Sequence, residues 1–324
     1  WADGGGESGE AEDLGYIYDS NTNTYTVYNA DGLMNVDELV NGGKTDINIT
    51  LDKNIDLTGK SWTPIGTDYD NSYTGTFDGG GHTITATNDK YAGLFGYLGN
   101  FNNGAATVKN VVMEGIQITC NHRLGYAGGV AGFSWGTIEN CSVSGSISGT
   151  VSVGGVVGVQ RDRPITGCSS SATVKGTINV GGVAGQTIFG ATLTACYATG
   201  NVIIEIDRTE NISGGGLVGF NDGISLLSCY ATGNVTSTGS STGNVHIGGF
   251  LGDNYITLTA CYWKNNHEQG IGYKKAGTVT EVTKVDGTGV TWQKAVDAMN
   301  TALQNKGSKW RYELKGALPT LRKQ

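Results

Sequence analysis

The sequence predicts an all-β fold, a parallel β-helix, and three observations lead to it. Gly accounts for 54 of the 324 residues, which disfavours long packed helices because each interior Gly costs roughly 0.5–1 kcal/mol relative to Ala. A Gly-rich block recurs along the chain, and the residues between the blocks alternate between apolar and polar. Short strands, Gly corners and a repeat near 30 residues are typical of a β-helix with one repeat per coil.

The recurring block marks the coils. It reads GG(V/L/F)xG at residues 128–132, 154–158, 181–185, 215–219 and 248–252, and the variant AGLFG precedes these at residues 92–96. About ten residues after each of the last five blocks comes a Cys: Cys141, Cys168, Cys196, Cys229 and Cys261, spaced by 27, 28, 33 and 32 residues. We expect the Gly pairs to form corners with positive φ and to let neighbouring backbones approach closely.

Within one repeat the side chains alternate with a period of two. After the second block, Cys141, Val143 and Ile147 fall on one face of the chain, whereas Ser142 and Ser144 fall on the other. The same alternation follows the next two Cys residues. This pattern predicts strands with one buried face.

The Cys residues occupy one shared position on the apolar face. Six Cys in an exported chain would also suit a disulfide framework. A common inward position instead predicts a ladder of buried free thiols, which pack as small hydrophobes. Val111 holds the equivalent place in the first repeat, and Cys120 is out of register.

Both ends of the solenoid need covering, because an open end exposes core and unpaired strand edges. Residues 31–40 predict a short amphipathic helix with an Asp cap at the N-terminal end. Residues 291–304 predict a longer helix that starts at Thr291 and covers the C-terminal end. Its apolar stripe consists of Trp292, Ala295, Val296, Met299 and Leu303.

The Gly blocks resemble the GLUG motif of secreted and surface proteins of gut Bacteroidetes and some Firmicutes. Residues 73–84 (YTGTFDGGGHTI) and 62–66 (WTPIG) are similar to the coil that commonly precedes such repeats, and residues 310–321 (WRYELKGALPTL) to a short C-terminal strand. The resemblance covers about residues 24–321. It implies a right-handed parallel β-helix on the cell surface, in proteins often labelled as adhesins; some such proteins carry the label of immunoglobulin A1 protease.

The expected organisation has three parts. Residues 1–13 are a flexible, acidic, Gly-rich leader, and residues 14–290 form the β-helix, with GLUG-like repeats from about 91 to 263. Residues 291–324 form the C-terminal helix and strand.

Charge and composition limit the partners. The net charge of -8 argues against nucleic acid, which would call for a basic face. The sequence contains no run of 18 apolar residues that would predict a membrane span. We therefore expect an extracellular, surface-associated monomer, and a lipid tether upstream of residue 1 is one means of attachment. We expect no cofactor and no metal, since the four His form no ligand-spaced set with Cys.

Protease motifs are weak. His267-Glu268 lacks the second His of H-E-x-x-H, and the G-x-S-x-G matches at residues 132–136 and 239–243 do not lie at a strand-to-helix elbow. Whether the chain is an enzyme therefore stays open, with a binding protein favoured. The enzymatic alternative is a polysaccharide lyase or glycoside hydrolase, which would need clustered charges. Two insertions supply such charges: Arg161, Asp162, Arg163, Glu205, Asp207 and Arg208.

The outward face offers a candidate binding site. The residue after the inward Cys is Tyr three times in succession: Tyr197, Tyr230 and Tyr262. Further along the same strands come Thr199, Thr232, Asn201 and Asn234. This pattern predicts an exposed Tyr ladder flanked by hydroxyls and amides, a combination that suits host or dietary glycans and glycoproteins. The alternatives are Tyr rings that merely pair across coils, and a structural accessory domain of a larger secreted protein.

Overall fold

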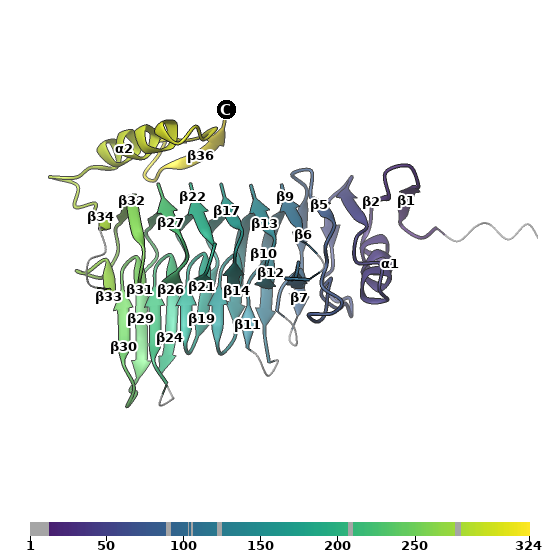
Figure 1. Cartoon of the computed structure of the whole chain (residues 1–324), viewed down its shortest axis with the longest axis horizontal. Helices are drawn as coiled ribbons and strands as arrows, with labels where there is room; N and C mark the ends of the chain where they lie inside the picture. The colour runs from purple at the N-terminus through teal and green to yellow at the C-terminus, as the bar shows by residue number, and fades with distance from the viewer. Residues whose placement is uncertain are drawn as a thin grey trace, which may run out of the picture.

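The computed structural model describes residues 13–88, 92–102, 104, 106–121, 125–206, 210–275 and 280–324. Its strands wind into coils stacked along one axis, and each strand pairs in parallel with its equivalent in the next coil (Figure 1). One coil runs through β15 (Ser152–Gly154), β16 (Val157–Arg161), β17 (Pro164–Thr166), β18 (Ser169–Ser170) and β19 (Thr173–Gly176). The predicted parallel β-helix is confirmed.

Successive coils build three sheets and a separate C-terminal hairpin. The five-stranded sheet contains β11 (Tyr126–Ala127), β15, β20 (Asn179–Gly181), β25 (Ile212–Gly215) and β30 (Val245–Gly248). The seven-stranded sheet contains β8 (Phe95–Leu98), β12 (Ala131–Ser134), β16, β21 (Ala184–Ile188), β26 (Val218–Asp222), β31 (Leu251–Asn254) and β33 (Ile271–Lys274).

The 22-stranded sheet takes up to three short strands from each coil. It contains β1 (Tyr16–Asp19), β2 (Thr24–Val27), β3 (Asn48–Leu51), β4 (Ile55–Asp56), β5 (Thr76–Asp78), β6 (Thr83–Thr85), β7 (Thr87–Asn88), β9 (Thr107–Lys109), β10 (Val112–Thr119), β13 (Thr137–Glu139), β14 (Ser142–Ser148), β17, β18, β19, β22 (Thr192–Thr194), β23 (Tyr197–Ala198), β24 (Val202–Ile206), β27 (Ser225–Leu227), β28 (Tyr230–Ala231), β29 (Val235–Gly239), β32 (Thr257–Trp263) and β34 (Thr280–Lys284).

The Gly blocks form the corner between the five-stranded and seven-stranded sheets. A Cβ atom on Gly185 would lie 2.4 Å from the backbone nitrogen of Val153, and one on Gly154 would lie 2.1 Å from the backbone oxygen of Val157. None of the Gly residues in the five GG blocks has a positive φ. The predicted close approach is confirmed, but the predicted positive φ is wrong: these glycines are required for space between coils.

The left-handed corners lie elsewhere, one residue before each inward Cys. Their φ angles are between 50° and 65°, at Asn140, Gly167, Ala195, Ser228 and Ala260. Non-Gly residues in this region are strained, Asn least of all. The corner before each Cys therefore turns the chain so that the thiol points inward.

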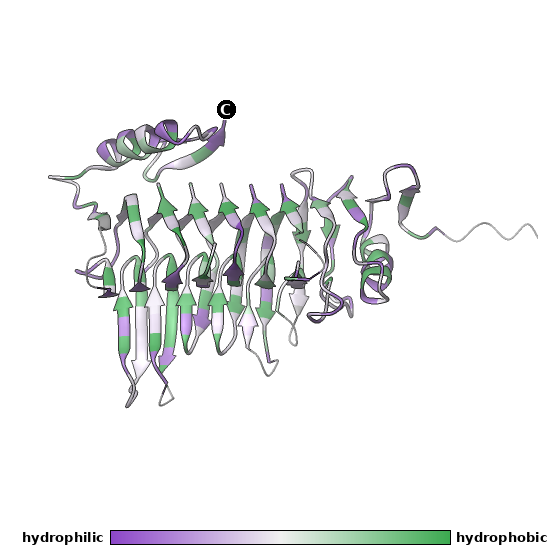
Figure 2. Ribbon diagram, in the orientation of Figure 1, coloured by the Kyte–Doolittle hydropathy of each residue, from purple (hydrophilic) through white to green (hydrophobic). Residues whose placement is uncertain are grey.

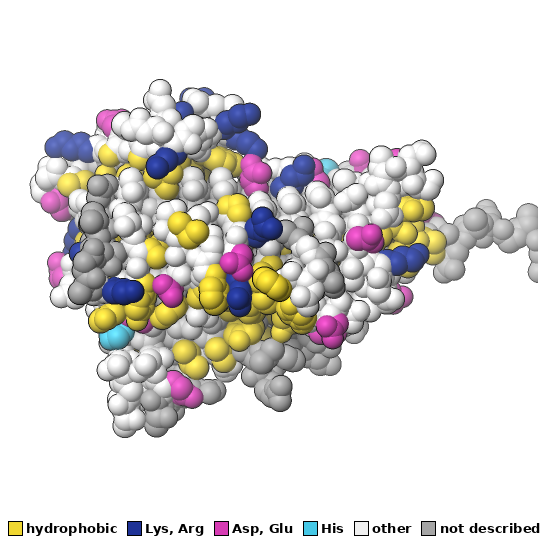
Figure 3. All heavy atoms as spheres, in the orientation of Figure 1, with side chains coloured by type: hydrophobic (Ala, Val, Ile, Leu, Met, Phe, Trp, Pro, Cys, Tyr) yellow, Lys and Arg dark blue, Asp and Glu magenta, His cyan; other side chains and the backbone are white. Residues whose placement is uncertain are grey.

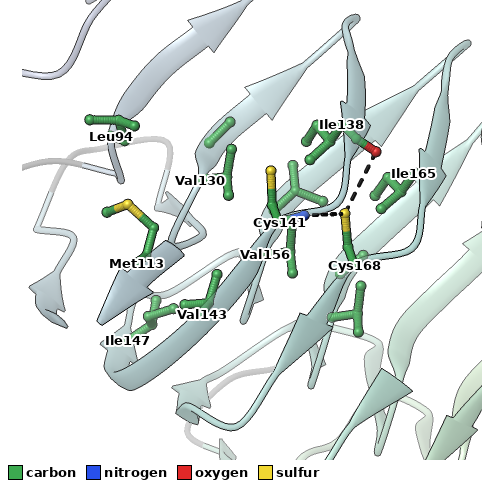
Figure 4. Packing of buried hydrophobic residues seen from close by; sticks show 14 of the residues in the cluster. Leu94, Met113, Val130, Ile138, Cys141, Val143, Ile147, Val156, Ile165 and Cys168 are labelled. Atoms are coloured by element: carbon green, nitrogen blue, oxygen red, sulfur yellow. Dashed lines mark hydrogen bonds between the residues drawn. The ribbon is translucent and has the colours of Figure 1, made fainter. Parts of the chain in front are cut away.

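The core is a continuous column of apolar side chains along the coil axis, and Figure 2 shows hydrophobic residues recurring at equivalent places in successive coils. Cys141 and Cys168 point into this column beside Ile138, Val156 and Ile165 (Figure 4). The thiols contact backbone groups of the neighbouring coil; the Cys168 Sγ, for example, lies 3.4 Å from the Cys141 nitrogen. All six Cys are buried free thiols, as predicted.

We expect the six thiols to resist modification while the chain is folded. The sulfur atoms are buried, so a reagent cannot reach them. Burial also raises the pKa of the Cys168 and Cys229 thiols, which disfavours the reactive thiolate form. Ellman's reagent should therefore label almost nothing in buffer at pH 8 and about six thiols in guanidinium. Rapid stoichiometric labelling of the folded chain would contradict the interior ladder.

A helix closes the N-terminal end, as predicted. Helix α1 (Ala30–Asn41) buries Leu33, Val36 and Val40 in the core. The predicted Asp cap is wrong, because the Asn29 side chain accepts from the backbone nitrogen of Gly32 at 2.8 Å. The side chain before the helix thus satisfies one of the free N–H groups of its first turn.

A buried carboxyl group makes this N-terminal cap sensitive to pH. Asp37 is 4% exposed and accepts hydrogen bonds from Asn41 and, at 3.0 Å, from the Thr63 hydroxyl. Burial raises its pKa to about 7, against the opposing effect of these hydrogen bonds.

We expect the cap to lose stability as the pH rises from 4 to 8. The folded state holds the Asp37 proton up to about pH 7, whereas the unfolded chain releases it near pH 4. At about 1.4 kcal/mol per pKa unit, the effect is at most about 4 kcal/mol. Hydrogen exchange of α1 amides measures it, and Asp37→Asn should be nearly flat over this range. Equal pH dependence in the variant would exclude Asp37 as the cause.

The C-terminal segment follows the predicted pattern but not the predicted place. Helix α2 (Trp292–Asn305) begins at Thr291, whose side chain accepts from the Lys294 nitrogen, and it buries the predicted stripe. It is followed by an antiparallel hairpin of β35 (Trp310–Glu313) and β36 (Thr320–Lys323). Helix and hairpin lie along the side of the last coils rather than across their end (Figure 1). The reason is an aromatic surface on that side, against which the stripe packs.

Candidate functional site: a hydroxyl-lined groove beneath the C-terminal hairpin

The three predicted Tyr residues do form a ladder. Tyr197 pairs in register with Tyr230, and Tyr230 with Tyr262, in consecutive coils. The first two rings stack with centroids 4.8 Å apart and planes within 2°. Alternation along the strands therefore placed all three side chains on the outward face correctly.

The prediction that this ladder is exposed is wrong. Tyr230 is fully buried, and its hydroxyl donates to the Pro319 carbonyl at 2.5 Å. Its ring contacts Trp292 and Tyr312, with centroids 5.1 and 5.8 Å away. The C-terminal helix and hairpin thus cover the middle of the ladder, and burial raises the pKa of Tyr230 well above its usual value.

The predicted polar residues beside the ladder do not form a single site with the Tyr rings. Asn201 and Asn234 are exposed, and the Asn201 side chain accepts from the backbone nitrogen of Asn234 at 3.0 Å. This contact ties two coils together. Thr199 and Thr232 are half-buried, and only Thr199 lines the groove described next.

The hairpin does not lie flat on the coils but roofs a groove of about 340 Å³. Its floor comes from residues of five consecutive coils, and its wall comes from the hairpin turn. The lining residues are Val112, Met113, Glu114, Ser142, Val143, Ser144, Ser169, Ser170, Ser171, Tyr197, Thr199, Tyr230, Leu318, Pro319 and Thr320. A smaller hollow of about 160 Å³ adjoins it and shares Ser142, Ser169 and Tyr197.

A change of side-chain size along one outward row creates the groove. Ser142, Ser169, Tyr197 and Tyr230 follow one another in register. Tyr230 covers one face of the Tyr197 ring, whereas the small Ser169 lies one coil away on the other side. The second face of Tyr197 is therefore turned toward the groove.

The floor carries hydroxyl groups that the protein leaves available. In the described part of the chain, the side chains of Ser142, Ser169, Ser171 and Thr199 have no hydrogen-bond partner, whereas Ser144 accepts from the Gly115 nitrogen at 3.0 Å. Such hydroxyls can each donate and accept. Together with an open aromatic face they are able to contact the hydroxyl groups and the apolar C–H face of a sugar ring.

The hairpin is fixed to the coils at several points. Trp310 packs over Gly167, where a Cβ atom would lie 2.2 Å from the indole ring. The Tyr312 hydroxyl donates to the Ser228 carbonyl at 2.8 Å, and the Lys323 ammonium lies 2.6 Å from a Glu139 carboxylate oxygen. The roof of the groove is thus a built part of the structure.

The described lining of the groove is mostly uncharged. Among the described lining residues, Glu114 supplies the one carboxylate, whereas glycoside hydrolysis ordinarily uses two facing carboxyl groups. Nowhere in the described chain do three or more His, Cys, Asp or Glu side chains form a metal-ligand group.

The charged insertions, the alternative predicted site, are not brought together. Arg161 ends a strand of the seven-stranded sheet and pairs with Asp162 at 3.1 Å. Glu205 lies in β24 of the 22-stranded sheet and pairs with Lys175 at 2.8 Å. Arg163 is exposed, and Asp207 and Arg208 lie outside the described residues. These charges therefore occupy different corners of the coil, so the predicted single cleft is wrong.

Sequence reasoning missed the Ser residues of the groove, although a signal for them existed. The residue after the inward Cys reads Ser, Ser, Tyr, Tyr, Tyr along the five repeats. A step from small to large in one outward row predicts a hollow beside an aromatic face. The hairpin wall had no such signal, because Pro319 is 89 residues from the Tyr230 that it contacts.

The chain is similar to several known proteins. The family model of the GLUG motif matches residues 124–148 and 210–236. Halomucin of Haloquadratum walsbyi is 33% identical over 46% of this chain, and a candidate Gly-rich membrane protein of Evansella cellulosilytica is 34% identical over 37%. This chain spans only 2% and 14% of the lengths of these two relatives.

One solved structure shares the fold. It is the crystal structure of a candidate immunoglobulin A1 protease from Bacteroides ovatus, with a TM-score of 0.68, 19% identity and coverage of 92% of both chains. In the described part of this chain, neither helix is long and apolar enough to cross a membrane. The chain is a parallel β-helix that carries GLUG motifs.

Proposed function

We propose that this chain is a non-catalytic, extracellular, adhesin-like β-helix that binds glycans or glycoproteins in the groove beneath the C-terminal hairpin. The observation that carries the proposal is the open face of Tyr197 beside hydroxyls that have no hydrogen-bond partner among the described residues. The volume of about 340 Å³ falls within the range of roughly 300–1,000 Å³ that is usual for ligand pockets. A pyranose stacked on Tyr197 would lie over Ser169 and Ser142.

The names of the relatives support an extracellular setting. One is a halomucin and the other a Gly-rich membrane protein, and both names are consistent with the cell surface. The few charged side chains also fit such a role. Figure 3 shows them scattered over a surface that is mostly uncharged.

The test is an array of glycans and glycoproteins that is probed with the wild type and with two variants in which a Ser is replaced by Tyr. Ser169→Tyr should extend the Tyr stack into the groove and fill it, so binding should fall at least about tenfold. Ser146→Tyr is the matched control, because Ser146 is exposed on the same sheet and does not line the groove. It should bind like the wild type.

Tyr197→Ala tests the stacking contribution from the other direction. We expect a loss of about two- to tenfold, since aromatic stacking contributes roughly 0.5–1.5 kcal/mol. Binding that is equal in Ser169→Tyr and wild type would place the ligand elsewhere. An array without any bound glycan or glycoprotein would overturn the proposal.

A further inference from the structure

A second aromatic site lies at the corner between the seven-stranded and 22-stranded sheets, away from the groove. The Arg161 guanidinium lies over the Phe189 ring, 3.9 Å from its centroid, and 5.5 Å from the centroid of Trp135. Trp135, Arg161 and Ile188 follow one another in consecutive coils. A cation is thus held between two aromatic side chains from neighbouring coils.

Two features of Phe189 are unfavourable for the stability of the fold. Its side chain is 57% exposed, and its φ of 57° lies in the left-handed region. That conformation costs roughly 1–2 kcal/mol for a residue with a Cβ atom, and water contact with the ring adds to the cost. Asp162, the equivalent residue of the preceding coil, has a φ of 60° as well, so the left-handed conformation belongs to the corner, whereas the exposed aromatic ring is particular to Phe189.

The guanidinium has capacity to bind a ligand. Its Nε donates to the Asp162 carboxylate at 3.1 Å, and in the described chain neither Nη atom has a hydrogen-bond partner. The exposed Arg163 is next but one in sequence. Asp162 and, two coils along, Asp222 are the nearby acids. The end of a guanidinium can hold both oxygens of a carboxylate.

Cation and ring together define the class of ligand. Neutral sugars would use the ring alone, and a simple anion would use Arg161 alone. We propose that this corner binds a carboxylate-bearing sugar such as a uronic acid, with the carboxylate on the Nη atoms of Arg161 and the sugar ring beside the part of the Phe189 side chain that Arg161 leaves exposed. The site goes beyond the proposed groove and shares no residue with it.

The experiment uses a galacturonate hexamer and its fully methyl-esterified form, which has the same sugar rings without the charge. Isothermal titration of the whole chain with the acid should show binding, and the ester should show none at the same concentration. Arg161→Gln should weaken the acid at least about tenfold. Lys175→Gln is the matched control, because it removes the same charge from a different corner.

Phe189→Asn tests the ring without damaging the fold. Asn tolerates the left-handed region, so this variant should melt no lower than the wild type and yet bind the acid several-fold more weakly. Equal binding of acid and ester, equal losses in Arg161→Gln and Lys175→Gln, or no binding of the acid would each overturn the proposal. Groove variants such as Ser169→Tyr should leave acid binding unchanged, so the two proposals fail separately.

Discussion

Gly185→Ala should prevent the chain from folding to its native stability. The added Cβ atom would lie 2.4 Å from the Val153 nitrogen and 2.7 Å from the Ser152 carbonyl carbon, both backbone atoms of the preceding coil. Backbone atoms in a paired ladder cannot move aside as a flexible side chain can. We expect a loss of roughly 3 kcal/mol or more, measured by thermal or denaturant unfolding, or a failure to recover soluble protein.

Gly316→Ala is the control for this substitution. No heavy atom lies within 4 Å of a Cβ at that position, and φ is not positive there. The control should unfold within about 0.5 kcal/mol of the wild type. If Gly185→Ala also unfolded like the wild type, the GG blocks would not be required for the close approach of the two sheets.

The Gly blocks show how far sequence reasoning reached. Their recurrence predicted the coil, because a corner repeated at intervals near 30 residues is typical of a solenoid. Their physical role was only half predicted. Glycine is used both for positive φ and for space, and the sequence does not distinguish the two; the positive φ falls on Asn140 and Ala195 instead.

Helix α2 shows a second limit. Thr291 and the stripe from Trp292 to Leu303 predicted the helix and its buried face. An amphipathic stripe states that a helix packs against something, but it does not state against what. The partner surface is the Tyr ladder, and the helix that covers Tyr230 begins more than 60 residues further along the chain.

The candidate site depends on that same long-range contact. The floor of the groove could have been predicted from the sequence, since Ser142, Ser169 and Tyr197 occupy equivalent outward positions in successive coils. The wall of the groove could not be predicted in this way, because the turn at Leu318 and Pro319 is remote in sequence from the floor residues that it contacts. A groove between a repeat and a remote segment has no local signature.

Tyr312→Ala should release the C-terminal segment from the coils. Tyr312 is 2% exposed, its ring lies beside Tyr230, and its hydroxyl donates to the Ser228 carbonyl at 2.8 Å. Truncating a buried aromatic side chain costs about 3–5 kcal/mol. We expect the loss in the docking of residues 291–324 rather than in the coils, seen as rapid proteolytic removal of that segment and a shift in Trp fluorescence.

Two further variants separate docking from general damage. Tyr312→Phe keeps the ring but leaves the Ser228 carbonyl without its partner, so it should cost about 1–3 kcal/mol and loosen the segment only partly. Tyr18→Ala removes a ring that is 46% exposed and should leave the C-terminal segment protected. Because Leu318 and Pro319 form the wall of the groove, Tyr312→Ala should also abolish glycan binding there while galacturonate binding at Arg161 persists. If residues 291–324 stayed resistant to protease in Tyr312→Ala, Trp292 and Trp310 would be sufficient to keep the C-terminal segment docked on the coils.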